Sequence, residues 1–278
     1  MLINYFYGIL LGAVQGITEF LPISSTGHLI LIEKLLGISQ ENFGLTFDAL
    51  LHLGTLISLL WFFKKDWLNI ITTPFRLKDK KNSQDLNLIK LLIVATIPGA
   101  LFGLVLEKKV ETVFRSPLLV GISLIVFSFV LVVVEKWSQK SKTIKDLKTK
   151  DAILTGFAQA VALIPGVSRS GITIAAGMWE GLTREQAAKF TFLISAPIIA
   201  GAGGKKLIDV ILLFLNHQMP QGELWFYLSG MLSAAVFGYL TIKYFLKFIS
   251  HNTLYPFIYY RIFLGLLVIF VFFMKSSN

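Results

Sequence analysis

The chain has 278 residues, of which 55% are hydrophobic and 15% are charged, with a net charge of +10 and a mean hydropathy of +0.71. Soluble domains are typically about a quarter charged, so this composition excludes an ordinary soluble protein and indicates an integral membrane protein. The basic residues gather in loops between apolar segments, so we expect the lipid bilayer, and no nucleic acid, as the partner. The chain has no cysteine, which excludes disulfides and thiolate metal sites.

The first apolar segment is interrupted. Residues 2–21 predict a helix whose glycines recur every four residues, which suits close helix packing. These glycines are Gly8, Gly12 and Gly16. Pro22 ends this helix, and residues 28–36 resume as a second short helix. Two short halves joined by a break predict a re-entrant hairpin or a broken helix.

Polar residues gather at that break, inside a segment otherwise as apolar as a membrane span. Gln15 and Glu19 are four residues apart, so a helix places both on one face. The break itself holds Ser24, Ser25, Thr26, Gly27 and His28. Ionisable groups are costly inside a membrane, so these residues predict a functional site. Hydroxyls and a helix N-terminus beside them favour binding of an anion or phosphate.

Six further apolar segments predict membrane spans, at residues 45–63, 91–106, 117–134, 190–215, 225–242 and 256–274. Pro98–Gly99 predicts a kink, and GAGGKK at 201–206 predicts an interruption of the fourth of these spans. Lys205 and Lys206 are interpreted as a helix break or as a pair reaching the membrane interface. A second broken hairpin is expected from two short helices at 152–164 and 171–180.

Lys and Arg are distributed unevenly among the loops. Loops 64–90, 135–151 and 243–255 hold 15 of them, whereas loops 107–116 and 216–224 and the C-terminal tail hold 4. The positive-inside rule therefore places the first three loops in the cytoplasm. Both chain ends then face outside, the first hairpin enters the membrane from outside, and the second enters from the cytoplasm.

The chain contains an internal repeat. A shift of 144 residues aligns Gly12 with Gly156, Gln15 with Gln159, Ser24 with Ser168, Gly27 with Gly171 and Gly37 with Gly181. Each half is a hairpin followed by three spans, and because three is odd the halves insert in opposite orientations. The sequence thus predicts one all-α integral membrane domain over residues 1–278, with an inverted-topology repeat: repeat one at about 1–134 and repeat two at about 152–278.

The break of the second hairpin carries the sequence PGVSRSGIT, residues 165–173. Arg169 stands between Ser168 and Ser170 where a helix begins, and Thr173 follows one turn later. A guanidinium fork with hydroxyls at a helix start suits a phosphate or a carboxylate. Because the broken helices of inverted repeats meet near the membrane midplane, we expect Arg169 to face the first hairpin across a small polar cavity. The residues that it would face are Glu19, Ser25 and His28.

Some of these residues also have plain structural interpretations. One hydroxyl of the run 24–26 is expected to be a helix N-cap, and Ser25 is chosen as the free one by its position. His28 is interpreted as functional rather than as a core histidine, because histidine titrates near neutral pH. The pair Asp48 and His52 is interpreted as packing or helix pairing, since two ligands do not make a metal site.

The two signatures QGITEFLPISSTGH and PGVSRSGIT together resemble the undecaprenyl-diphosphatase family, the bacitracin-resistance phosphatases of the bacterial envelope. The resemblance extends over essentially the whole chain. It implies an enzyme that removes the terminal phosphate of undecaprenyl diphosphate and so recycles the lipid carrier for peptidoglycan synthesis. It also implies a multi-pass protein of the bacterial cytoplasmic membrane whose active site faces outside, and dependence on a divalent cation, Mg²⁺ or Ca²⁺.

The match to the family signatures assigns roles residue by residue. Glu19, Ser25, His28 and Arg169 are the catalytic candidates; Ser24, Thr26, Ser168, Ser170 and Thr173 are the substrate-binding candidates. Glu19 and the amide oxygen of Gln15 are the candidate metal ligands. In the mechanism that we expect, Ser25 attacks the terminal phosphorus, and His28 or Glu19 takes its proton. Direct attack by water is the rival mechanism.

A transporter is the alternative from another class. Inverted repeats with broken helices are common in transporters, so the chain could flip a polyprenyl-phosphate lipid and use Arg169 to hold its phosphate. Holding a phosphate requires no base beside a nucleophile, so the clustering of Glu19 and Ser25 favours the phosphatase. A purely structural membrane subunit is disfavoured by the buried ionisable groups. The sequence leaves the oligomeric state open, a homodimer included.

Overall fold

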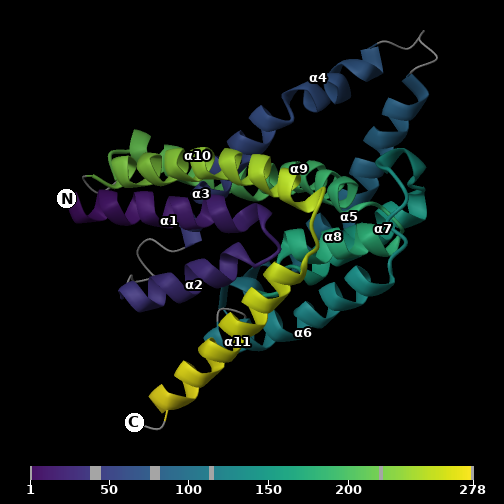
Figure 1. Cartoon of the computed structure of the whole chain (residues 1–278). Helices are drawn as coiled ribbons and strands as arrows, with labels where there is room; N and C mark the ends of the chain where they lie inside the picture. The colour runs from purple at the N-terminus through teal and green to yellow at the C-terminus, as the bar shows by residue number, and fades with distance from the viewer. Residues whose placement is uncertain (1, 38–44, 76–81, 113–115, 219–221, 277–278) are drawn as a thin grey trace.

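The computed structural model describes residues 2–37, 45–75, 82–112, 116–218 and 222–276. Within these ranges the chain is helical, with two short 3₁₀ turns and an isolated bridge between Lys142 and Leu182. The helices are α1 (Leu2–Phe20), α2 (Ser25–Leu36), α3 (Leu45–Phe62), α4 (Lys64–Thr72), α5 (Asn82–Thr112), α6 (Pro117–Trp137), α7 (Thr149–Val161), α8 (Arg169–Trp179), α9 (Arg184–Leu215), α10 (Glu223–Ile249) and α11 (Tyr255–Ser276). Figure 1 shows their arrangement.

Four of the described helices are long and apolar enough to cross a membrane: α5, α6, α10 and α11. The pair α3 and α4, bent by 79°, makes a fifth if it is counted as one span. Many large apolar side chains on these helices are exposed, such as Leu104, Phe263 and Phe270. Such a surface is unstable in water and suits lipid, so the predicted all-α membrane fold is confirmed.

Helix packing relates the two halves of the chain. Helix α1 of the first half packs on α10 of the second half. The equivalent helix of the second half, α7, packs on α5 of the first half. The pairs α3 with α9 and α6 with α11 each join equivalent helices of the two halves. This exchange of partners is the arrangement that an inverted repeat produces. The boundaries of the repeats near residues 134 and 152 stay a prediction.

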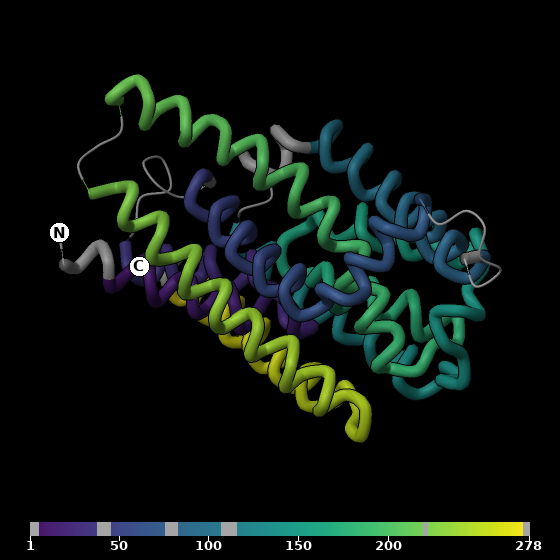
Figure 2. The backbone as a smooth tube through the Cα atoms, turned by 90° about the horizontal axis from the view of Figure 1, so that it is seen from above, coloured from purple at the N-terminus to yellow at the C-terminus, as the bar shows by residue number. Residues whose placement is uncertain are grey.

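The start of α1 and the end of α11 lie towards the same end of the molecule (Figures 1 and 2). This agrees with the prediction that both chain ends face the same side. The axes of the long helices α9 and α10 are roughly aligned in Figure 2, and the chain runs along them in opposite directions. The two hairpins, α1–α2 and α7–α8, reach into the middle of the molecule from opposite ends (Figure 1).

Glycines allow the closest helix contacts. A Cβ on Gly12 of α1 would overlap the backbone carbonyl of Gly230 on α10, and one on Gly16 would lie 2.7 Å from the carbonyl oxygen of Ala234. The predicted close packing of this glycine stripe is therefore confirmed, and its partner is α10.

The predicted interruption of the span 190–215 is wrong, because α9 is continuous from Arg184 to Leu215. Residues 190–196 are buried on every side, so tertiary contacts hold the helix there. Further along, a Cβ on Gly203 would lie 2.6 Å from Leu53 Cδ2 of α3. Gly203 therefore allows α3 to approach α9 closely. A glycine can do this inside a helix without ending it.

The interpretation of residues 64–90 as a loop is also wrong in part. Lys64–Thr72 form α4, and α5 begins at Asn82 and continues to Thr112, into the predicted loop 107–116. Pro98 lies inside this continuous helix. Leu68 and Ile71 of α4 are more than half exposed, so this helix presents apolar side chains beside its lysines. Such a helix suits the membrane interface.

Glu135 at the end of α6 joins three elements. Arg184 at the start of α9 donates to both carboxylate oxygens, with Nε 3.0 Å from each. The backbone N–H of Leu254, just before α11, donates to Oε2 over 3.1 Å. The Glu135 side chain is only 2% exposed, and its counter-charges are Arg184, which binds both oxygens, and Lys140, whose Nζ lies 3.8 Å from Oε1.

Candidate active site

Each hairpin break begins with a serine that caps the next helix. Ser24 Oγ accepts a hydrogen bond from the N–H of Gly27 over 3.3 Å, and Ser168 Oγ accepts one from Gly171 over 3.1 Å. Both serines have a positive φ, 74° and 75°, which non-glycine residues rarely adopt. The two serines are 144 residues apart, so the breaks share one backbone geometry. Ser24 is therefore the N-cap expected within the run 24–26.

The two breaks lie against each other, as the sequence predicts. The backbone N–H of Gly166 donates to Ser24 Oγ over 3.1 Å, and the hydroxyl of Ser170 donates to the carbonyl oxygen of Leu21 over 2.8 Å. These bonds satisfy backbone groups that the breaks deprive of helical partners. The tips of the first and second hairpins are thus joined.

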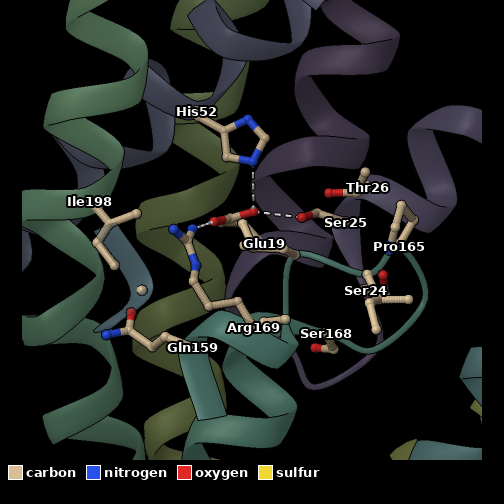
Figure 3. A pocket seen from close by; sticks show the side chains of 14 residues that line it. Glu19, Ser24, Ser25, Thr26, His52, Gln159, Pro165, Ser168, Arg169 and Ile198 are labelled. Carbon is tan, nitrogen blue, oxygen red and sulfur yellow. Dashed lines mark hydrogen bonds and ion pairs between the residues drawn. The ribbon is translucent and has the colours of Figure 1, made fainter. Parts of the chain in front are cut away.

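Glu19, at the end of α1, is the centre of the polar contacts (Figure 3). Its carboxylate accepts hydrogen bonds from Gln15 Nε2 over 3.0 Å and from Ser25 Oγ over 2.6 Å. Arg169 forms an ion pair with it from the second hairpin, and His52 Nε2 of α3 lies 3.5 Å from its Oε2. A carboxylate that is only 7% exposed needs such partners, because burial of an unpaired charge is costly.

The contact between Ser25 and Glu19 has one direction. An ionised carboxylate only accepts, so the Ser25 hydroxyl is the donor. Ser25 is among the residues that line the cavity described below, and its hydroxyl donates to the carboxylate. Glu19 is therefore in position to take this proton if the Ser25 oxygen attacks an electrophile.

His28 lies outside this cluster. Its Nδ1 is 2.7 Å from the carbonyl oxygen of Ser24, and its Nε2 is 2.7 Å from the hydroxyl of Tyr260 on α11. A carbonyl only accepts, so Nδ1 carries the proton and Nε2 accepts from the tyrosine. Both ring nitrogens are engaged in this way, so in this geometry His28 does not contact the Ser25 hydroxyl. Glu19, which does contact it, is the remaining candidate for the base.

The histidine that does reach the cluster is His52, a contact that its interpretation as packing or helix pairing with Asp48 did not include. Its Nδ1 is 2.7 Å from the carbonyl oxygen of Asp48, and its Nε2 faces Glu19. Both neighbours are hydrogen-bond acceptors, and one ring nitrogen of His52 faces each of them. The sequence signal was the location of His52 near the start of an apolar span, where a polar side chain is costly.

A cavity of about 190 Å³ opens beside Glu19 (Figure 3). Its polar lining comes from both hairpins and from α3: Glu19, Ser24, Ser25, Thr26, His52, Gln159, Ser168 and Arg169. Apolar walls come from both long helices α5 and α9 and from the residues just before the second break. The predicted polar cavity between the hairpins is therefore present, with Thr26 and Ser168 at its surface.

Ser170 and Thr173 do not line this cavity. Ser170 donates to Leu21, and the Thr173 hydroxyl donates to the carbonyl oxygen of Arg169 over 2.6 Å. Both side chains are less than 5% exposed. These two predicted substrate-binding residues therefore hold the second break in place, whereas Arg169, one residue before Ser170, faces the cavity.

The candidate metal ligands can be compared with this geometry. The amide of Gln15 donates to Glu19, and its Oε1 is buried with no hydrogen-bond partner among the described residues. That oxygen has lone pairs free for a cation, next to a carboxylate one turn away. The described residues contain no group of three His, Cys, Asp or Glu that could hold a metal. One carboxylate and one amide oxygen are ligand types that suit Mg²⁺, which commonly completes its shell with water and substrate phosphates, but Gln15 is 0% exposed and is not among the residues that line the cavity.

Comparison with known proteins gives a consistent result. A family model described as bacitracin resistance protein BacA matches residues 8–267. A protein named undecaprenyl-diphosphatase from Pelotomaculum thermopropionicum is 42% identical over 264 residues, covering 95% of each chain. Proteins of the same name from Rubrobacter xylanophilus and Moorella thermoacetica are 44% and 43% identical, and the matches cover 94% and 96% of this chain and 95% and 97% of theirs.

Proposed function

The chain belongs to the bacitracin resistance protein family, and we propose that it is an undecaprenyl-diphosphate phosphatase, which hydrolyses undecaprenyl diphosphate to undecaprenyl phosphate and inorganic phosphate. One observation carries the proposal for its site: the Ser25 hydroxyl donates to Glu19 while Arg169 contacts the same carboxylate from the opposite hairpin. A nucleophile, a base and an anion-binding group thus meet at one cavity. Its biological role would be to recycle the lipid carrier for cell-wall synthesis, which accounts for bacitracin resistance.

Ser25 is proposed as the nucleophile. Its Oγ forms a bond to the terminal phosphorus while the bond from that phosphorus to the bridging oxygen breaks, and undecaprenyl phosphate leaves. Glu19 accepts the Ser25 proton, which it already holds in a hydrogen bond of 2.6 Å. Glu19 passes this proton to the leaving undecaprenyl phosphate and is ionised again. Water then attacks the phosphoserine and gives a proton to Glu19 while the bond between phosphorus and Ser25 Oγ breaks. Glu19 returns that proton to Ser25 Oγ, so inorganic phosphate leaves and the serine is restored.

Arg169 is proposed to bind the diphosphate. Its guanidinium reaches the cavity from the first turn of α8 and is about one-fifth exposed, so a phosphate could contact it. Its planar fork can bind two phosphate oxygens and offset the charge that develops in the transition state. His52 lies at the same wall of the cavity, with its Nε2 facing Glu19.

A divalent cation, Mg²⁺ or Ca²⁺, would be held by Glu19 and by the amide oxygen of Gln15, together with oxygens of the substrate. When bound, such a cation neutralises phosphate charge and orients the diphosphate. The free lone pairs of Gln15 Oε1 support this part of the proposal. Gln15 supplies an oxygen but no base, so proton transfer stays with Glu19.

The active site is proposed to face the outside of the bacterial cytoplasmic membrane, which follows from the uneven distribution of Lys and Arg among the loops. The oligomeric state and the lack of a nucleic-acid partner stay predictions from the sequence.

The experiment is phosphate release from undecaprenyl diphosphate by protein purified in detergent, with and without a chelator. Release that stops with chelator, and in both Arg169→Ala and Glu19→Ala, supports a metal-dependent phosphatase with its site between the hairpins. Absence of release from folded parent protein would favour the transporter that flips a polyprenyl-phosphate lipid. A lipid-flipping assay in vesicles then separates these two functions.

A further inference from the structure

Arg261 of α11 is a buried cation that the mechanism above does not use. Its side chain is 0% exposed, and α11 is a membrane-spanning helix. None of the ion pairs found in the described part of the chain includes Arg261. A buried arginine in a membrane protein is costly, which points to a specific role for its guanidinium.

The guanidinium binds three neutral oxygens. Its Nη1 donates to the carbonyl oxygen of Pro22 over 3.0 Å, and its Nη2 donates to the carbonyl oxygen of Gly166 over 3.1 Å. Its Nε donates to Ser128 Oγ over 3.1 Å, and the Ser128 hydroxyl in turn donates to the carbonyl oxygen of Leu124. The fork therefore links the break of the first hairpin, the break of the second hairpin and α6.

The two carbonyls occupy equivalent places in the two halves. Pro22 and Gly166 are 144 residues apart, which is the shift that relates the hairpins. Ser25 lies three residues after Pro22, and Arg169 lies three residues after Gly166. Arg261 thus binds one backbone carbonyl in each break. One carbonyl lies three residues before the proposed nucleophile, and the other lies three residues before the anion-binding arginine.

We propose that Arg261 is a positioning residue for the phosphatase reaction, because its planar fork fixes the two hairpin breaks relative to each other and so sets the placement of Ser25 opposite Arg169. This inference rests on the proposed function. A planar group with donors on separate nitrogens is needed, since a lysine ammonium is a point charge on a flexible stem. Loss of the fork leaves two buried carbonyls unpaired and allows the tips to separate.

The test combines activity with amide hydrogen exchange on parent, Arg261→Met, Arg261→Lys and Ser128→Ala proteins in detergent. In Arg261→Met we expect exchange to rise at least tenfold in peptides covering 20–27 and 164–171 but to stay unchanged in α3 and α10. We expect kcat for phosphate release to fall about 100-fold, the loss that a misplacement of about 1 Å produces, with KM changed less than threefold. Arg169 and the other cavity residues still bind the diphosphate.

The other two variants isolate the fork. Ser128→Ala leaves both carbonyl bonds in place, so we expect kcat to stay within threefold of the parent. Arg261→Lys keeps the charge without the fork, so we expect faster exchange in at least one tip and a kcat about tenfold lower. The Arg261→Lys protein also provides the exchange and activity test if Arg261→Met does not fold.

Three results would overturn the proposal: faster exchange at the tips with parental kcat, a lower kcat with parental exchange, or exchange that rises equally in α3, α10 and the tips of both Arg261 variants. The last result would make Arg261 a general structural residue. A parent protein that releases no phosphate would refute the proposed function instead, while the exchange measurement would still show whether Arg261 holds the tips together.

Discussion

Ser25 Oγ lies 2.6 Å from Glu19 Oε2 and donates its hydroxyl proton to that carboxylate across the break of the first hairpin. The two residues are six positions apart, so an uninterrupted helix would not align them in this way. The break at Pro22 is therefore what brings the hydroxyl back to the carboxylate at the end of α1.

The first prediction concerns Ser25. Ser25→Ala is expected to lower phosphate release at least 1,000-fold, because the nucleophile is lost while Arg169 and Glu19 remain. Rapid quenching of the parent protein with substrate labelled in the terminal phosphate should place the label on Ser25. Ser195→Ala is the matched control, since Ser195 is also buried but bonds to Thr191 within α9. Near-parental turnover by Ser25→Ala would instead establish direct attack by water.

The second prediction concerns His52. His52→Gln removes the imidazole that faces Glu19 but can keep one hydrogen bond, so we expect kcat/KM to fall about tenfold, within the range for loss of one polar contact in an active site. His251→Gln, at an exposed histidine after α10, is the matched control and should leave kcat/KM unchanged. If the two variants were indistinguishable in steady-state kinetics, His52 would have no part in the site.

The third prediction concerns the cation. Gln15→Glu adds a carboxylate beside Glu19, so the Mg²⁺ concentration for half-maximal activity should fall, whereas Gln15→Leu removes the ligand oxygen and should raise it. Because one added or lost ligand changes the affinity by about tenfold or more, a titration of Mg²⁺ after chelation separates the variants. Equal titration curves for both variants and the parent would remove Gln15 from the ligand set.

The fourth prediction compares two ion pairs. Arg184→Ala leaves the carboxylate of Glu135 buried and without its bidentate partner, so it should destabilise the protein by about 3 kcal/mol. Lys189→Ala breaks the pair with Asp66, whose side chains are 34% and 30% exposed, and should change stability by about 1 kcal/mol or less. Unfolding by SDS titration in mixed micelles measures both. Similar losses would mean that Lys140, whose Nζ lies 3.8 Å from Glu135 Oε1, supplies sufficient counter-charge without Arg184.

The fifth prediction compares two glycines. Gly12→Ala places a methyl group against the Gly230 carbonyl, so it should separate α1 from α10 and lower stability by about 1–3 kcal/mol. A Cβ on Gly103 of α5 meets no atom within 4 Å, so Gly103→Ala should keep or raise stability, since alanine favours helix. The midpoint of thermal unfolding is the measurement. A tolerated Gly12→Ala would show that α1 can move away from α10 at little cost.

Much of the site could be predicted because its residues lie at the two breaks, which the sequence marks with proline, glycine and hydroxyls. Glu19, Ser25 and Arg169 meet as expected. The repeat at a shift of 144 residues predicts that the two breaks meet, because the broken helices of an inverted repeat meet near the membrane midplane, and this prediction requires no helix angle.

The roles of the two histidines could not be predicted from the sequence. His28 stands beside Ser25 in the sequence, yet its ring turns towards Tyr260, whereas His52 comes from a different helix and reaches Glu19. The rotation of α3 about its axis decides which side chain enters the cavity. That rotation depends on packing against α9 and α10, and no local pattern records it.

The continuity of α9 has a similar cause. The glycines and lysines at 201–206 have low helix propensity or high cost in a membrane, so they predict a break. Contact with Leu53 of α3 overrides this preference, because a helix with glycine at 203 packs more closely.

Ser24 and Ser168 share one backbone geometry, and the two breaks that they begin carry different functional groups. The backbone turn and its cap are the same in both halves, but the first half adds a carboxylate and the second has Leu163 at the equivalent position; the second adds a guanidinium where the first has Ser25. The two copies of the turn therefore contribute different functional groups to the same cavity. A protein assembled from two copies of either half would keep the architecture and lack half of the chemistry.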